Sequence, residues 1–271
     1  MMTLGFLGCG AIGSAISDIH QDFGQRILRH DLNLKSKLSD LMDADIIFIC
    51  LPTPQSKNGA CNISLIEDEL NKLNDMGFDK IIVMKSTVPA GTGMKLSEMF
   101  SFKYVSCPEF LREHNAKNDY LSQATHIIGC EEEIPTKLQD ALAPLRSDLR
   151  KVTITEAELA KYFHNTYNAW RITFANAFCD LSDVFDTDYN NILEAFCTIN
   201  DISSSYLRSS SEYKGFGGPC LPKDTAALAY LAKKLNLDSN IWDFMLNENL
   251  KRKVTLPPGL REVGFSAQKL K

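Results

Sequence analysis

The chain has 271 residues, of which 44% are hydrophobic, and a formal net charge of −5. This composition is that of a globular protein large enough for two domains, and it gives no reason to expect nucleic acid or a membrane as partner. The 8 cysteines include no C-x-x-C pair, and we expect no secretory leader before them. We therefore expect reduced thiols, a cytoplasmic protein and no bound metal.

The first 150 residues alternate short apolar runs with longer amphipathic stretches. That alternation is typical of an α/β domain, a doubly wound parallel sheet covered by helices. The apolar runs predict strands at 3–7, 26–30, 45–50, 80–84, 103–106 and 126–129. The amphipathic stretches predict helices at 11–23, 63–75 and 134–145.

Beyond residue 150 the pattern becomes all-helical. A long central helix is predicted from Glu156 to about residue 185, because this stretch contains no glycine or proline. Thr155 and Glu158 form a capping-box pattern at its start. Further helices are predicted at 188–199, 223–235 and 239–253, with a serine- and glycine-rich loop over 201–221. The predicted domains are 1–150, 151–255 and an irregular tail over 256–271.

A glycine-rich turn lies between the first predicted strand and the first predicted helix. Gly8, Gly10 and Gly13 match the pattern G-x-G-x-x-G, with Ala11 and Ile12 before the third glycine. This pattern lets the backbone approach a pyrophosphate closely at a helix N-terminus. The first domain is therefore predicted to be of Rossmann type and to bind NAD through these five residues.

An acidic residue after the second predicted strand favours NAD over NADP. Asp31 lies at about the distance where a carboxylate accepts the ribose hydroxyls of NAD. Lys35 follows it and is a further candidate for contact with the cofactor. Arg29 and Lys35 would be the groups to accept a 2′-phosphate, which leaves NADP open as an alternative.

The segment 215–224 surrounds one cysteine, Cys220, with glycines, a cation and a carboxylate. Glycines let the backbone approach a ligand closely, and the nearby Lys223 would favour a thiolate. We predict that Cys220 is a nucleophile. The alternative is a buried, inert cysteine in a glycine-rich turn.

Five blocks in the chain resemble those of a known family. They are LPTP at 51–54, KSTVPAGT at 85–92, CPEFLRE at 107–113, EAELAKYFHNTY at 156–167, and the cysteine loop. Together and in this order they resemble the UDP-glucose/GDP-mannose dehydrogenase family. The resemblance implies that a nucleotide sugar, UDP-glucose by default, is oxidised from primary alcohol to carboxylate with two NAD molecules in succession.

The resemblance also implies catalytic roles. Cys220 would attack the aldehyde left by the first hydride transfer, and a second transfer would give a thioester that water hydrolyses. Lys161 and Asn165, four apart on the long helix, would hold the developing oxyanion. The groups implied in proton transfer around a water molecule are Glu109, Thr87 and Asp224.

Contacts with the cofactor and the substrate follow from the same resemblance. The nicotinamide half of NAD would meet Thr53, Thr87 and Glu113. The sugar and its phosphates would meet Phe110, Leu111, Lys161, Asn165, Gly217 and Lys223. No motif supports a role for His164, which we interpret as a structural or surface group.

The resemblance implies a homodimer formed through the long central helix. Members of the family generally continue into a second Rossmann-like domain, which this sequence is not expected to contain. Two other functions stay open. A β-hydroxyacid dehydrogenase shares the domain plan and a Lys-x-x-x-Asn helix but needs no cysteine. A truncated, non-catalytic NAD-binding protein is the other, although the retained Cys220 argues against it.

Overall fold

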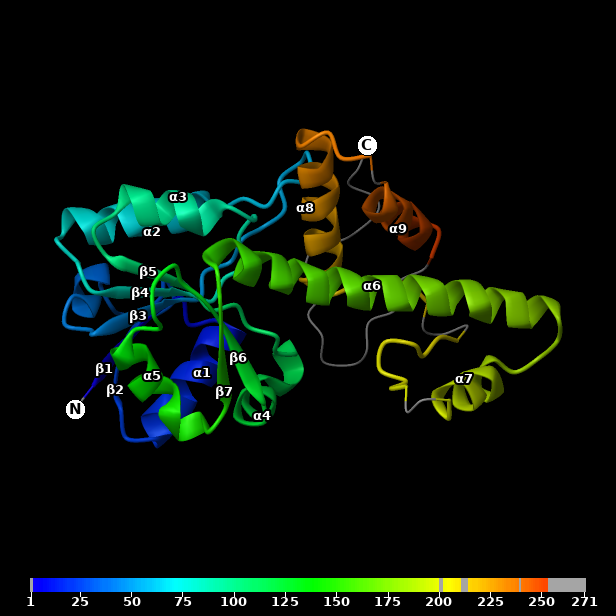
Figure 1. Ribbon diagram of the computed structural model, residues 1–271, viewed down its shortest axis with the longest axis horizontal. Helices are drawn as coiled ribbons and strands as arrows, with labels where there is room; N and C mark the ends of the chain where they lie inside the picture. The colour runs from blue at the N-terminus through cyan, green and yellow to red at the C-terminus, as the bar shows by residue number, and fades with distance from the viewer. Residues whose placement is uncertain (1, 200–201, 211–213, 239, 253–271) are drawn as a thin grey trace. The chain divides into compact units, whose positions relative to one another are not determined.

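The computed structural model describes residues 2–199, 202–210, 214–238 and 240–252 (Figure 1). These residues form two compact units. The first unit contains Met1–Pro54 and Cys61–Lys161, and the second contains Gln55–Ala60 and the described part of Tyr162–Lys271. The predicted tail over 256–271 and part of the predicted loop over 201–221 lie outside the described residues.

Within the described residues, a seven-stranded sheet forms the centre of the first unit. Its order is β2-β1-β3-β4-β5-β6-β7, and all neighbours pair in parallel except β5 with β6. The strands are β1 Thr3–Leu7, β2 Arg26–His30, β3 Ile46–Ile49, β4 Ile81–Met84, β5 Lys103–Ser106, β6 Thr125–Gly129 and β7 Asp148–Val152. The Rossmann-type sheet followed by a helical region is confirmed.

The strand β7 is not among the predicted ones. It pairs with β6 at the edge of the sheet, and three of its five residues are exposed. Its sequence DLRKV is mostly charged and carries no apolar run. An exposed edge strand of this kind lacks the continuous apolar run by which buried parallel strands are predicted.

Helices cover both faces of the sheet (Figure 1). One layer contains α1, α4 and α5, and the other contains α2 and α3. Successive strand residues face the two layers in turn, so Phe48 belongs to one core and Ile47 to the other. The helices are α1 Ala11–Asp22, α2 Ser64–Asp75, α3 Thr92–Met99, α4 Ala116–Leu121 and α5 Thr136–Leu142, with single turns η1 Leu38–Leu41, η2 Glu113–Asn115 and η3 Ala143–Leu145.

The long helix α6 spans Ile154–Val184 and has 31 residues. Thr153 and Glu156 form the reciprocal bonds of a capping box, with Thr153 N donating to Glu156 Oε2 at 2.8 Å and Glu156 N donating to Thr153 Oγ1 at 3.3 Å. The predicted capping pair of Thr155 and Glu158 is therefore wrong by two residues. Glu158 is buried instead. No helix in the described ranges is both long enough and apolar enough to pass through a bilayer.

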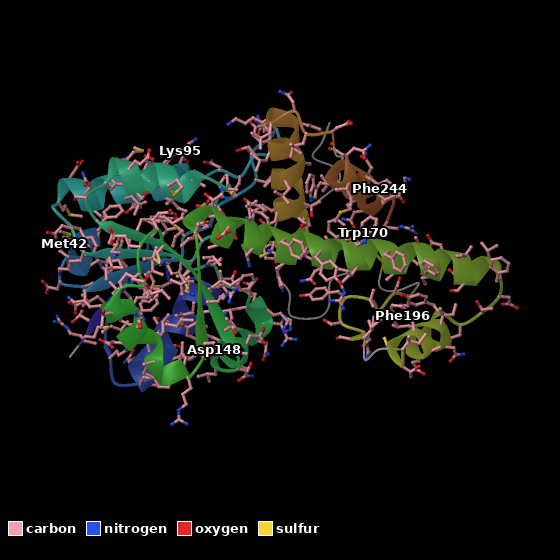
Figure 2. All side chains as sticks on the ribbon, in the orientation of Figure 1. Met42, Lys95, Asp148, Trp170, Phe196 and Phe244 are labelled. Carbon is pink, nitrogen blue, oxygen red and sulfur yellow. The ribbon has the colours of Figure 1, made fainter. Side chains whose placement is uncertain are left out.

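The second unit packs further helices against the rest of α6. They are α7 Tyr189–Cys197, α8 Leu221–Lys234 and α9 Ile241–Leu250. Trp170 of α6 is partly buried and packs against the core that includes Met245 of α9, and its ring centroid lies 6.5 Å from that of Phe244 (Figure 2). Phe174 is 47% exposed and lies 4.7 Å from the Phe178 ring. Trp170 thus supports the fold of this unit, whereas Phe174 belongs to its surface.

Candidate functional site

The glycine turn has the geometry that close approach of a pyrophosphate requires. A Cβ at Gly13 would come 2.0 Å from the carbonyl oxygen of Gly8, so no side chain fits where α1 packs on the turn. A Cβ at Gly10 would meet nothing within 4 Å, so this side of the turn is open. α1 begins at Ala11 and directs the positive end of its dipole to this opening. These residues fit a dinucleotide.

Asp31 is bound to the glycine turn. Its Oδ1 accepts a hydrogen bond from Asn33 N at 2.9 Å, and its Oδ2 accepts one from Cys9 N at 2.8 Å. These backbone donors lower the pKa of Asp31 below its ordinary value. The carboxylate is therefore ionised at neutral pH and is a suitable acceptor for ribose hydroxyls.

The two cations near Asp31 differ in their surroundings. Arg29 Nε donates to Ser17 Oγ at 2.8 Å, and its Nη2 lies 3.0 Å from Asp18 Oδ1, so the guanidinium is held against α1. Lys35 is exposed in the loop after β2. The arginine that would be needed to accept a 2′-phosphate is thus engaged elsewhere.

Thr53 and Thr87 meet beyond the carboxyl ends of β3 and β4. Thr53 Oγ1 donates to the carbonyl oxygen of Thr87 at 2.8 Å. Ser86 Oγ donates to the carbonyl oxygen of Leu51 at 2.7 Å and joins the same two loops. This edge is where ligands bind in open α/β sheets.

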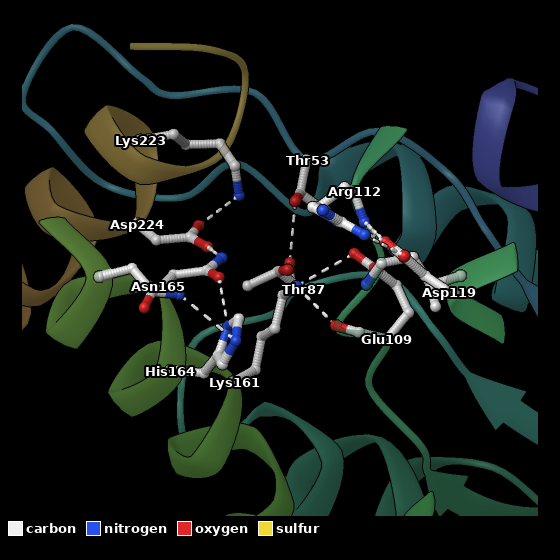
Figure 3. Close-up of polar contacts among 12 residues, drawn as sticks. Thr53, Thr87, Glu109, Arg112, Asp119, Lys161, His164, Asn165, Lys223 and Asp224 are labelled. Carbon is white, nitrogen blue, oxygen red and sulfur yellow. Dashed lines mark hydrogen bonds and ion pairs between the residues drawn. The ribbon is translucent and has the colours of Figure 1, made fainter. Parts of the chain in front are cut away.

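Glu109 and Lys161 form a shielded ion pair in the first unit (Figure 3). Lys161 Nζ lies 2.6 Å from the carbonyl oxygen and 3.0 Å from Oε1 of Glu109. Their side chains are only 4% and 13% exposed. Glu109 Oε2 accepts from Leu111 N at 2.6 Å, and the centroid of the Phe110 ring lies 5.5 Å from Lys161 Nζ. Two predicted site residues, Glu109 and Phe110, thus lie beside the Lys161 ammonium, and Leu111 is joined to them through Glu109.

The segment that carries Phe110 and Glu113 is fixed by a pair that no motif indicated. Arg112 Nε donates to Asp119 Oδ2 at 2.9 Å, and Arg112 Nη2 donates to Oδ1 at 2.6 Å. The Arg112 side chain holds the pKa of Asp119 well below its ordinary value. Glu113 begins the single turn η2 directly after Arg112. The predicted residues on either side therefore sit on an anchored loop.

In the second unit, Asp224 is fully buried and has polar neighbours on both oxygens (Figure 3). Asn165 Nδ2 donates to Asp224 Oδ2 at 2.6 Å, and Lys223 Nζ lies 2.7 Å from Oδ1. His164 Nδ1 lies 3.0 Å from Asn165 Oδ1. The amide of Asn165 is therefore oriented by a carboxylate on one side and an imidazole on the other.

Cys220 immediately precedes α8, which begins at Leu221 and not at residue 223 as predicted. Pro222 lies in the first turn, where its missing N–H needs no partner. The N-terminal N–H groups and dipole of a helix stabilise a negative charge such as that of a thiolate. Gly217 follows Phe216, whose backbone N and O bond to Asn249 at 2.7 and 2.8 Å.

Two family models match the chain. Residues 5–143 match the NAD binding domain of the UDP-glucose/GDP-mannose dehydrogenase family, and residues 155–251 match its central domain. The chain belongs to the UDP-glucose/GDP-mannose dehydrogenase family. The first match contains the glycine turn and Asp31, and it confirms NAD as the cofactor.

Individual proteins extend this finding. UDP-glucose 6-dehydrogenase of Rickettsia bellii (strain RML369-C) is 31% identical over 223 residues, which are 79% of this chain and 51% of that protein. The chain spans about half the length of the curated relatives it matches. A UDP-glucose dehydrogenase from Pyrobaculum islandicum has a TM-score of 0.84 at 25% identity, over 92% of this chain and 68% of that one.

A structure from outside the nucleotide-sugar enzymes shares the fold as well. Mycobacterium tuberculosis 3-hydroxyisobutyrate dehydrogenase has a TM-score of 0.72 at 14% identity, over 91% of this chain and 92% of that one. At this identity the likeness concerns the fold alone. The fold therefore does not separate the two dehydrogenase classes, whereas membership of the UDP-glucose/GDP-mannose dehydrogenase family does.

Proposed function

We propose that the chain catalyses the NAD-dependent oxidation of the primary alcohol of a nucleotide sugar, with UDP-glucose as the substrate. The observation that carries this proposal is Cys220 at the N-terminus of α8, next to the Lys223–Asp224–Asn165 network, in a chain of this family. Relatives named UDP-glucose 6-dehydrogenase support the choice of sugar and base.

The reaction proceeds in two oxidations separated by a covalent step. NAD, when bound, accepts a hydride in each oxidation. The first removes a hydride from the sugar's sixth carbon and a proton from its hydroxyl, which leaves an aldehyde. The Cys220 thiol then adds across the C=O bond: Sγ bonds to the carbon, the thiol proton passes to the oxygen, and a thiohemiacetal results. Loss of a second hydride and a proton gives a thioester, and water releases the carboxylate and returns the Cys220 thiol.

The other predicted residues supply charge and orientation. Lys161 and Asn165 are one turn apart on α6, and both carry hydrogen-bond donors suited to a developing oxyanion. Glu109 holds Lys161 through two oxygens, and we propose that its carboxylate exchanges protons during hydrolysis. Asp224 orients the Asn165 amide. We propose that Thr53, Thr87 and Glu113 meet the nicotinamide half of NAD.

The test is NADH formation by the purified chain with NAD and UDP-glucose, beside the Cys220→Ser variant. About two NADH per sugar are expected from the unchanged chain, because four electrons leave the alcohol. The variant is expected to lose the second NADH. A variant that still forms two would overturn the cysteine route. Turnover of 3-hydroxyisobutyrate in place of UDP-glucose would move the chain to the other dehydrogenase class.

We also propose a homodimer through α6. Apolar side chains at helical spacing stay exposed along this helix: Phe163, Tyr167, Phe174, Phe178 and Leu181. Exposed apolar side chains along one helix favour a protein–protein contact, and a second copy offers the same side chains in return. Light scattering at micromolar concentration is expected to report a dimer, and Phe178→Arg a monomer. A monomeric unchanged chain would refute the proposal.

A further inference from the structure

Glu158 is a buried carboxylate on α6 that binds the backbone N–H of Gly91, at the end of the loop after β4, and that of Gly93, in the first turn of α3. Its Oε2 accepts from Gly91 N and its Oε1 from Gly93 N, both at 2.7 Å. The side chain belongs to a residue only 3% exposed. Both oxygens are thus used, and both hydrogen bonds are charge-assisted when the carboxyl is ionised.

The fit around this carboxylate is close. Gly91 has φ +85°, a left-handed conformation that glycine adopts without strain, and it precedes the first residue of α3. A Cβ at Gly93 would come within 2.5 Å of Ile154 and Tyr104 and within 2.9 Å of Glu158 Oε1. The contact between this segment and α6 therefore requires glycine at both positions.

The loop in question is the one that carries Thr87. At its start, Ser86 Oγ binds the carbonyl oxygen of Leu51, and at its end Glu158 binds the two glycines. Thr87 itself accepts the Thr53 hydroxyl through its carbonyl oxygen. The segment between β4 and α3 is consequently fixed at both ends.

One turn further along α6, Lys161 binds Glu109 in the loop after β5. The N-terminal part of α6 therefore holds the loops that follow two neighbouring strands, one through Glu158 and one through Lys161. Movement of either loop changes the distance between the groups proposed to act on the nicotinamide and on the water molecule.

We propose that Glu158 is a positioning residue that fixes the position of the Thr87 loop relative to Lys161 and Glu109. This inference rests on the proposed function, because it concerns the same reaction. Glu158 acts through the backbone of Gly91 and Gly93 and not by contact with a ligand. Its removal is expected to leave the other groups of the first unit in place but let Thr87 depart from its position.

The experiment compares Glu158→Gln with Glu156→Gln at pH 8. Glutamine keeps one oxygen acceptor but turns an NH₂ group to the second N–H, so one of the two bonds is lost. Glu156 lies on the same helix and caps it through Thr153, away from the loop, so its variant is the matched control. The readouts are amide exchange over 86–93, NAD affinity, kcat and KM.

In Glu158→Gln, exchange over 86–93 is expected to rise about tenfold or more, and kcat to fall by about the same factor, since small misplacement of reacting groups is costly. NAD binding is expected to weaken, while the KM for the sugar changes little. In the control, Glu156→Gln, the exchange rate over 86–93 and kcat are both expected to stay within about twofold of the unchanged chain. Unchanged exchange in Glu158→Gln overturns the inference, as does faster exchange with unchanged kcat.

Failure of the proposed function is distinguishable from failure of this inference. A chain that forms no NADH with any sugar refutes the function, while exchange and NAD affinity still decide the role of Glu158. Weaker NAD binding in Glu158→Gln together with faster exchange supports the positioning role. Equal NAD binding in the two variants, in a chain without turnover, overturns it.

Discussion

The carboxyl of Glu158 is expected to make the stability of the protein depend on pH. Burial raises its pKa from 4.5 to about 7, although the N–H groups of Gly93, Gly91 and Thr92 oppose this shift. A group whose folded pKa is raised contributes stability below its unfolded pKa and loses it as pH rises through the folded value. The relevant window therefore runs from about pH 4.5 to about pH 7.

The size of the effect follows from the shift. At about 1.4 kcal/mol per pKa unit, the contribution of Glu158 to the free energy of unfolding falls by about 3 kcal/mol between the two ends of this pH window. Glu158→Gln carries no titrating group at this position, so its free energy of unfolding is not expected to show this fall with rising pH. Tyr104 faces the carboxyl from β5, and burial keeps its pKa well above the window. The difference between the two proteins thus isolates one carboxyl.

The assay is urea unfolding of both proteins between pH 4.5 and pH 8, with the free energy of unfolding compared at each pH. The unchanged protein is expected to lose about 3 kcal/mol relative to the variant as pH rises through the window. A difference that is flat, or that grows in favour of the unchanged protein, would refute the reasoning. Glu156→Gln again serves as the control.

Two further predictions concern the glycine turn and a buried histidine. Gly13→Ala is expected to unfold the turn and abolish NAD binding, because its Cβ would clash with Gly8 O, whereas Gly10→Ala should keep the melting temperature and weaken only NAD binding measured by titration. Equal loss of stability in both variants would contradict this. His126 is buried, both its ring nitrogens lack a hydrogen-bond partner among the described residues, and burial lowers its pKa to about 3. A lowered histidine pKa contributes stability above pH 6.5 that is lost as pH falls, so His126→Leu should flatten acid unfolding and stabilise by about 1 kcal/mol at pH 7. Lower stability of this variant at pH 5 than the parent would count against it.

The sheet was predictable because its central strands are buried on both faces. Runs such as Ile46–Ile49 and Ile81–Met84 contain apolar residues alone, and the glycine turn marks the first crossover. β7 was not predictable, since its charged residues face solvent. α3 and α4 are short, and their apolar residues are too few to show a helical period.

The site residues were predictable as a set, but their partners were not. Glu109 and Lys161 are 52 positions apart, and nothing local in either segment indicates the other. The Glu158 carboxylate was interpreted as a helix cap because its spacing from Thr155 fits one, but tertiary contact turned it to Gly91 and Gly93. For α8, Pro222 was a usable signal, because proline is favoured in the first turn of a helix.

The segment Gln55–Ala60 has a consequence for any attempt to divide the protein. It interrupts the first unit in sequence yet belongs to the second, with Ser56 N bound to Ala60 O at 2.7 Å. The ideal Cβ position at Gly59 lies 3.4 Å from the carbonyl oxygen of Ala226 and 3.8 Å from Tyr230 Cβ, both on α8. A gene fragment that stops after Lys161 would strip this small turn of its packing partner. Recombinant expression of the NAD-binding half alone therefore calls for a shortened linker between Pro54 and Cys61.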